Sequence, residues 1–193
     1  MGANQQEPQG GERGTVYWLD FAARTLACPL EVSLHDLGTF GQRYFGLQWL
    51  AAVAAMVLFP GFFPGCDPTP LWVWTAAFVL GSFVAKAKSD RRRARGEFEE
   101  HSYYGGTPSL MRVLRRAREA HVKGAIEPVL AFFTGAVLTG WNEALGMFLI
   151  LAALALLFCV KASELQNRTR ALDMHDAMID QRRVTDQWRR TRR

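Results

Sequence analysis

Histidine and glutamate side chains that could bind a metal or act as acid and base occur in a charged stretch of the chain. Glu99 and His101 lie close together there, and His121 follows further along. Imidazole and carboxylate groups are common metal ligands and general acids or bases. However, no HExxH-like spacing places two of them on one helical face. The sequence therefore predicts no metal site and no cofactor, and an interfacial enzyme using Glu99, His101 and His121 is an alternative.

Two further carboxylates stand at the edges of apolar blocks. Glu127 precedes Pro128 at the start of one block, and Glu143 opens the next. A carboxylate at membrane depth is a functional candidate. In the first turn of a helix, however, the helix dipole favours an anion without any further role. We expect this structural role, at the level of the lipid headgroups, for both residues.

Two arginine clusters could contact phosphate groups. The sequence around them shows no nucleic-acid recognition motif and no interleaved aromatic residues, so nucleic acid is not the expected partner. Basic segments beside a membrane helix bind anionic lipids. The candidate lipid contacts are Arg91, Arg92, Arg93, Arg112, Arg115 and Arg116.

The elements that must position these residues are apolar on all sides. No charged residue occurs in four blocks, namely 45–63, 71–85, 128–142 and 144–160. Helices of a soluble protein have a polar face, whereas helices surrounded by lipid do not. The sequence therefore predicts an all-α, polytopic membrane protein with four short transmembrane helices in two hairpins.

The second hairpin depends on a break inside one long apolar run. The sequence Gly140-Trp141-Asn142-Glu143 supplies the break, because Asn142 can cap a new helix. A hairpin that dips into the bilayer without crossing it is the alternative for this pair, because about 20 apolar residues normally span a membrane.

The positive charges are unevenly placed. Of the 23 Lys and Arg residues, three precede Phe45, eleven lie between Lys86 and Lys123, and nine follow Val160. Cytoplasmic segments carry the excess of such residues. Both termini and the middle loop are therefore expected in the cytoplasm, with the protein in a bacterial inner membrane.

The segments between the spans are polar or amphipathic. A helix from Thr15 to Ala27, ended by Pro29, is expected to lie on the membrane surface or pack on a partner. A basic amphipathic helix is expected to start at Thr107-Pro108. The predicted organisation is a disordered N-terminus 1–14, a juxtamembrane segment 15–43, a first hairpin 44–85, a basic loop 86–123, a second hairpin 124–160 and a helical tail 161–193.

Two patterns indicate helix packing. Small residues recur every four positions in two spans, which lets helices approach closely. In the tail, apolar residues recur every seven positions from Leu165. The packing candidates are Ala77, Gly81, Ala85, Ala131, Gly135, Leu172 and Ile179.

These patterns favour a non-catalytic subunit or scaffold of a larger membrane assembly. The expected partners are anionic lipids of the bilayer and either further copies of the chain or other membrane subunits. A small transporter or channel component is an alternative, although few polar residues, such as Gln48 and Thr134, fall inside the spans. The sequence names no specific biochemical activity.

Overall fold

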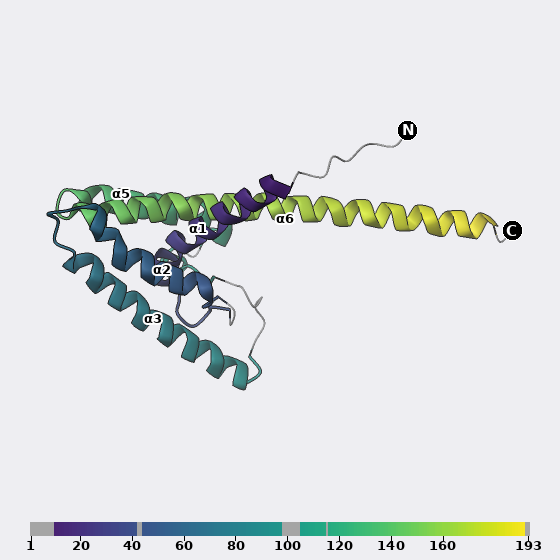
Figure 1. The fold of residues 1–193 in the computed structure, drawn as a ribbon. Helices are drawn as coiled ribbons and strands as arrows, with labels where there is room; N and C mark the ends of the chain where they lie inside the picture. The colour runs from purple at the N-terminus through teal and green to yellow at the C-terminus, as the bar shows by residue number, and fades with distance from the viewer. Residues whose placement is uncertain (1–9, 42–43, 98–104, 115, 192–193) are drawn as a thin grey trace. The chain divides into compact units, whose positions relative to one another are not determined.

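The computed structural model describes residues 10–41, 44–97, 105–114 and 116–191 of the chain. Its α-helices are α1 (Gly10–Leu34), α2 (Leu47–Leu58), α3 (Thr69–Ala94), α4 (Glu119–His121), α5 (Glu127–Thr139) and α6 (Glu143–Thr191) (Figure 1). Two 3-10 turns, η1 (Phe59–Phe62) and η2 (Ser109–Arg112), and a π-helical turn, η3 (Val122–Ile126), complete the elements. Within these ranges the structure forms two isolated β-bridges and no strand. The all-α prediction is confirmed.

Among the described residues, three helical stretches are long and apolar enough to cross a membrane. They are α3, the combined stretch Glu119–Thr139, and α6. The apolar helix of the first predicted span, Leu47–Phe62, is shorter. A membrane location is therefore supported, and four complete crossings stay a prediction.

Helix α1 differs from the sequence-based expectation at both ends. It begins at Gly10, inside the segment predicted to be disordered, and continues through Pro29 to Leu34. A proline inside a helix removes one hydrogen bond and costs about 3 kcal/mol. Burial of Pro29 together with Cys28 and Leu30 opposes this cost. The predicted end at Pro29 is therefore wrong, and the C-terminal half of α1 is a core element rather than a surface helix.

One hydrophobic core joins five helices in residues 1–159, the larger of two compact units. Phe148 of α6 is fully buried, and its ring meets Phe59 and Trp74 edge-on at centroid distances of 5.1 and 5.7 Å. Such aromatic contacts add to the free energy gained by burying apolar surface. The core also includes Cys28 and Val32 of α1, Ala52 and Met56 of α2, Leu71 and Phe78 of α3, and Ala131 of α5.

Helices α5 and α6 form the tightest contact. A Cβ atom on Gly135 would lie 2.9 Å from the backbone oxygen of Gly146 and 2.9 Å from the backbone nitrogen of Ile150. A Cβ atom on Gly146 would lie 2.4 Å from the backbone nitrogen of Thr139. Both glycines are therefore required for the backbones to approach this closely. The chain breaks between α5 and α6 at the expected place, residues 140–142, and Asn142 Oδ1 accepts a hydrogen bond from the Leu145 N–H at 2.9 Å.

The basic amphipathic helix predicted from Thr107 is not formed. Only the 3-10 turn η2 occurs there, and no α-helix follows until α4, within the residues described on either side of position 115. The backbone is instead bonded to the end of α1: Asp36 N–H donates to the Thr107 carbonyl at 2.8 Å, and His35 and Pro108 form a β-bridge. These long-range contacts override the local helical preference.

The smaller unit, residues 160–193, contains the continuation of α6 as far as Thr191. From Glu164 to Arg189 every side chain is exposed. The exposed apolar residues include Leu165, Leu172, Met178 and Ile179.

Candidate functional site

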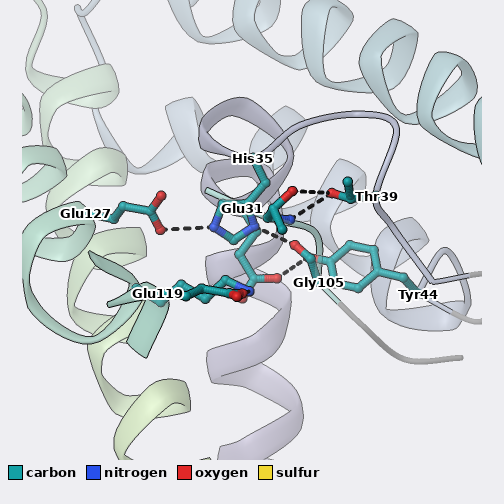
Figure 2. Close-up of polar contacts among 9 residues, drawn as sticks. Glu31, His35, Thr39, Tyr44, Gly105, Glu119 and Glu127 are labelled. Atoms are coloured by element: carbon teal, nitrogen blue, oxygen red, sulfur yellow. Dashed lines mark hydrogen bonds and ion pairs between the residues drawn. The ribbon is translucent and has the colours of Figure 1, made fainter. Parts of the chain in front are cut away.

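His35 follows directly after α1, and its ring is almost fully enclosed. Its side chain is 3% exposed, and Nε2 lies 2.9 Å from Oε2 of Glu127. Its Nδ1 is hydrogen bonded to the carbonyl oxygen of Gly105 (Figure 2). The imidazole therefore connects the end of α1, the segment after the middle loop and the start of α5.

Glu127 is placed by an irregularity in the helix. It follows the π-helical turn η3 (Val122–Ile126), and it is itself the first residue of α5. A π-helical turn shifts the angular register of the residues that follow it and is frequent at functional sites. The Glu127 side chain is 0% exposed, and its Oε1 atom has no hydrogen-bond partner among the described residues. A helical turn directly precedes Glu127, so the residue does not stand at a free helix start as expected, and its burial and pairing with His35 were not predicted.

The hydrogen-bond partners restrict the protons on this pair. A carbonyl oxygen only accepts, so Nδ1 of His35 must carry the proton that it shares with Gly105. One further proton then lies between Nε2 and the Glu127 carboxyl group. The pair is either an imidazolium with a carboxylate or a neutral imidazole with a carboxylic acid. Both forms have zero net charge, which lowers the cost of burial.

A second, partly buried carboxyl group, that of Glu31, lies beside the first pair (Figure 2). The Tyr44 hydroxyl donates a hydrogen bond to Oε2 of Glu31. Burial, with the Glu31 charge adding to it, raises the pKa of Tyr44 well above its usual value. Burial and then Glu31 raise the pKa of the Cys28 thiol to about 12. Near neutral pH the thiol is therefore protonated and is a poor nucleophile.

Gly106 allows the chain to pass close to His35. Its φ angle is +81°, and a Cβ atom there would lie 3.1 Å from His35 Cβ and 3.1 Å from Phe40 Cε2. A residue with a side chain would be strained by both the backbone angle and the contact. Gly105, the preceding residue, provides the carbonyl oxygen that is bonded to Nδ1 of His35. In the structure Gly105 and Gly106 also shape the wall of the histidine site.

Asp36 also helps to hold the segment 105–112 in place. Its Oδ1 accepts the Gly38 N–H at 3.0 Å, and Oδ2 pairs with Arg112. The Gly38 hydrogen bond, followed by the contact with Arg112, lowers the pKa of Asp36. The Thr107 N–H donates to Oγ1 of Thr39 at 2.7 Å. These bonds hold residues 105–112 against the turn after α1.

The predicted lipid-binding arginines differ in their contacts. Arg112 is engaged by Asp36, and Arg92 donates to the Gly38 carbonyl at 2.7 Å. Arg91, Arg93 and Arg116 are exposed, and Arg115 lies outside the described residues.

The packing candidates are divided between the interior and the surface. Ala131 and Gly135 are buried in the contact between α5 and α6, and Ala85 is fully buried in α3. Gly81 faces Val32 of α1, while Ala77 is exposed. Leu172 and Ile179 are exposed on the tail. The small residues of α5 therefore pack within the chain.

The proposed alternative site of Glu99, His101 and His121 is not assembled by the described part of the chain. Glu99 and His101 lie outside it, and His121 is exposed. No group of three or more potential metal ligands occurs among the described residues. Glu143 is exposed in the first turn of α6, as expected for a residue that interacts with the helix dipole.

Comparison with known proteins adds no relative: no family model, no curated protein and no solved structure matches this chain.

His35 was missed because nothing local distinguishes it. It lies in a stretch, 30–43, whose glycines obscure any helical period. One general signal was available: a carboxylate next to an apolar block can be buried, and it then needs a partner. Lys123 lies four residues before Glu127, so the sequence alone does not point to His35.

Proposed function

We propose that this protein is a non-catalytic subunit or scaffold of a larger membrane assembly. Its spans anchor it, and the helical tail 160–193 makes the contacts with other subunits. The observation that carries this proposal is the exposed tail. Leu165, Leu172 and Ile179 are 66%, 57% and 38% exposed and recur at intervals of seven residues. An apolar stripe of this spacing packs against another helix.

The interior of the larger unit supports the same proposal. The His35–Glu127 pair has almost no exposed surface, so a substrate has no direct contact with both groups. Its bonds join segments that are 70 and 92 residues apart in the chain. This arrangement suits a clamp that holds the membrane part in one conformation.

The tail also has the composition of a contact element. Basic residues gather near its end, where Arg182, Arg183 and Arg189 lie in the helix. Such residues can contact an anionic lipid surface or acidic partner segments, as expected for a cytoplasmic arm. We propose that both termini lie in the cytoplasm of a bacterial cell, in accord with the distribution of positive charge.

The test is to remove the apolar stripe without touching the membrane part. Leu172→Asp with Ile179→Asp should dissociate the assembly, because two charges would be buried at the contact. Gln166→Asp with Gln181→Asp adds the same charge at exposed positions outside the stripe. Particle size in mild detergent and cross-linking in native membranes are the measurements.

The expected result is a smaller particle for the stripe variant and an unchanged one for the control. Cross-links between two copies of the chain would identify self-association, and cross-links to other proteins a mixed complex. A monomeric wild type without cross-linked neighbours would refute the proposal and favour the transporter or enzyme alternatives.

A further inference from the structure

An open pocket of about 420 Å³ lies in the larger unit, between the end of α1, the middle of α3 and η2. One part of its wall is apolar and is formed by Val32, Ala77, Phe78 and Gly81. The other part carries charged side chains, which are Asp36, Lys88 and Arg112. The pocket is therefore amphiphilic, with its apolar and charged walls separated along α3.

The pocket wall changes from apolar to charged along α3 in the direction expected for a helix that runs from the membrane interior to its surface. Ala77 lies inside the apolar run of α3, and Lys88 lies just past its end at Ala85. Eleven residues of helix correspond to a rise of about 16 Å. When α3 crosses a bilayer, the Lys88 end is at the level of the headgroups and the Ala77 end is among the acyl chains.

The charged end has an excess of positive charge. The Asp36 carboxylate is already engaged by Arg112 and the Gly38 N–H. Lys88 adds a second cation, and its aliphatic chain passes alongside Gly38. Two cations against one carboxylate would attract a negatively charged group.

The apolar end is kept open by a glycine. A Cβ atom on Gly81 would make only ordinary contacts, at 3.5 Å from Val32 Cγ1 and 3.9 Å from Leu37 Cδ2. Alanine would therefore fit at position 81, whereas leucine would extend beyond this contact and fill the groove. Comparing the alanine and leucine variants therefore shows whether lipid binding depends on an open groove or on glycine at position 81.

We propose that this pocket binds one anionic phospholipid. Its phosphate group lies between Lys88 and Arg112, and one acyl chain lies along the α3 surface at Ala77 and Gly81. The lipid fits the pocket through its negative charge and also through its apolar chain. A free phosphate ion has the charge but no apolar chain.

The experiment uses the full chain in mild detergent, with native mass spectrometry to count bound lipids. The probes are phosphatidylglycerol, phosphatidylcholine and inorganic phosphate. The pocket variants are Lys88→Gln and Gly81→Leu, and the matched controls are Lys86→Gln and Gly81→Ala. Lys86 is an exposed lysine of the same helix that does not line the pocket.

The wild type should retain one phosphatidylglycerol molecule in preference to phosphatidylcholine, and inorganic phosphate should not displace it. Lys88→Gln should weaken this binding about fivefold, since one basic residue near an anionic surface contributes about 1 kcal/mol. Gly81→Leu should abolish it, while both controls bind as the wild type does. Circular dichroism checks that each variant is folded.

Three outcomes would overturn the proposal. One is equal retention of the two lipids by the wild type. Another is equal weakening by Lys86→Gln and Lys88→Gln, which would show a diffuse charge effect. The third is displacement of the lipid by inorganic phosphate, which would show a phosphate site without an acyl-chain groove.

Discussion

The buried pair of His35 and Glu127 places two ionisable side chains in a largely apolar interior. Each group would be costly to bury alone, and together they form one neutral unit with a shared proton. The lone pair that Oε1 of Glu127 leaves without a partner shows that the pair is not fully satisfied. Its value therefore lies in fixing one arrangement of distant segments rather than in adding a large net stability.

This interpretation predicts strong coupling between the two residues. His35→Leu or Glu127→Leu alone should lower the free energy of unfolding by about 3–5 kcal/mol, because the remaining polar group stays buried without its partner. The double variant should lose clearly less than the sum of the two. Denaturant unfolding in detergent, followed by circular dichroism, measures all three values.

Glu143→Leu is the control for a carboxylate at a helix start. Glu143 is exposed, so only its favourable interaction with the helix dipole is lost, at a cost of about 0.3–1 kcal/mol. Additive losses at His35 and Glu127 would contradict the proposed clamp.

At the level of single residues, the sequence predicted what local chemistry determines. Asn142 caps α6, because a cap needs only a side-chain oxygen next to free backbone N–H groups. The partner of Glu127 could not be predicted in this way. His35 reaches it only through the fold, across 92 residues of sequence.

The helices show the same division between local and long-range causes. The apolar blocks of α2, α3, α5 and α6 were recognised, because lipid and core both select apolar helices. The length of α1 and the loss of the expected helix after Thr107 were not predicted. The continuation of α1 depends on the burial of Pro29 and its neighbours. The loss of the expected helix depends on the contact between residues 35–40 and 105–108, whose bridges and hydrogen bonds replace those of a helix.

The contact between α5 and α6 makes a prediction at this scale. Gly135→Ala and Gly146→Ala should each force the two helices apart, since the added carbon would lie 2.9 Å or less from backbone atoms of the facing helix. We expect a loss of about 1–3 kcal/mol for each, as for other overpacked sites. Thermal unfolding in detergent and a cysteine cross-link between the two helices are the measurements.

Gly140→Ala provides the comparison, because its Cβ atom would meet only the Val137 carbonyl oxygen at 3.5 Å. It should change stability by less than either of the other substitutions. Equal effects at all three glycines would mean that backbone flexibility, and not the helix contact, explains their presence.

For the whole molecule, the two short connections lie together. The side-chain nitrogen of Asn142, between α5 and α6, donates to the backbone oxygen of Asp67, between α2 and α3, at 2.8 Å. Neither connection contains Lys or Arg. This proximity agrees with the proposed topology, in which both short loops face the outside of the cell.

The topology predicts which native cysteine reacts with an impermeant reagent. Cys66 is partly exposed in the first short loop, while Cys28 and Cys159 are buried. In intact spheroplasts Cys66 should be labelled from outside, and Cys66→Ser should remove the signal. A cysteine introduced at Arg95, which is exposed beyond the end of α3, should be labelled only after permeabilisation. Labelling of that position from outside would overturn the orientation.

The bond between His35 and Glu127 also sets an order of events during synthesis. His35 emerges from the ribosome 92 residues before Glu127. At about 5–20 residues per second, that interval lasts roughly 5–18 s. During this interval α2 and α3 are made while His35, at the end of α1, lacks its partner. A nascent chain that ends before α5 therefore carries an unpaired histidine at the end of α1, and membrane quality-control factors would encounter the protein in that form.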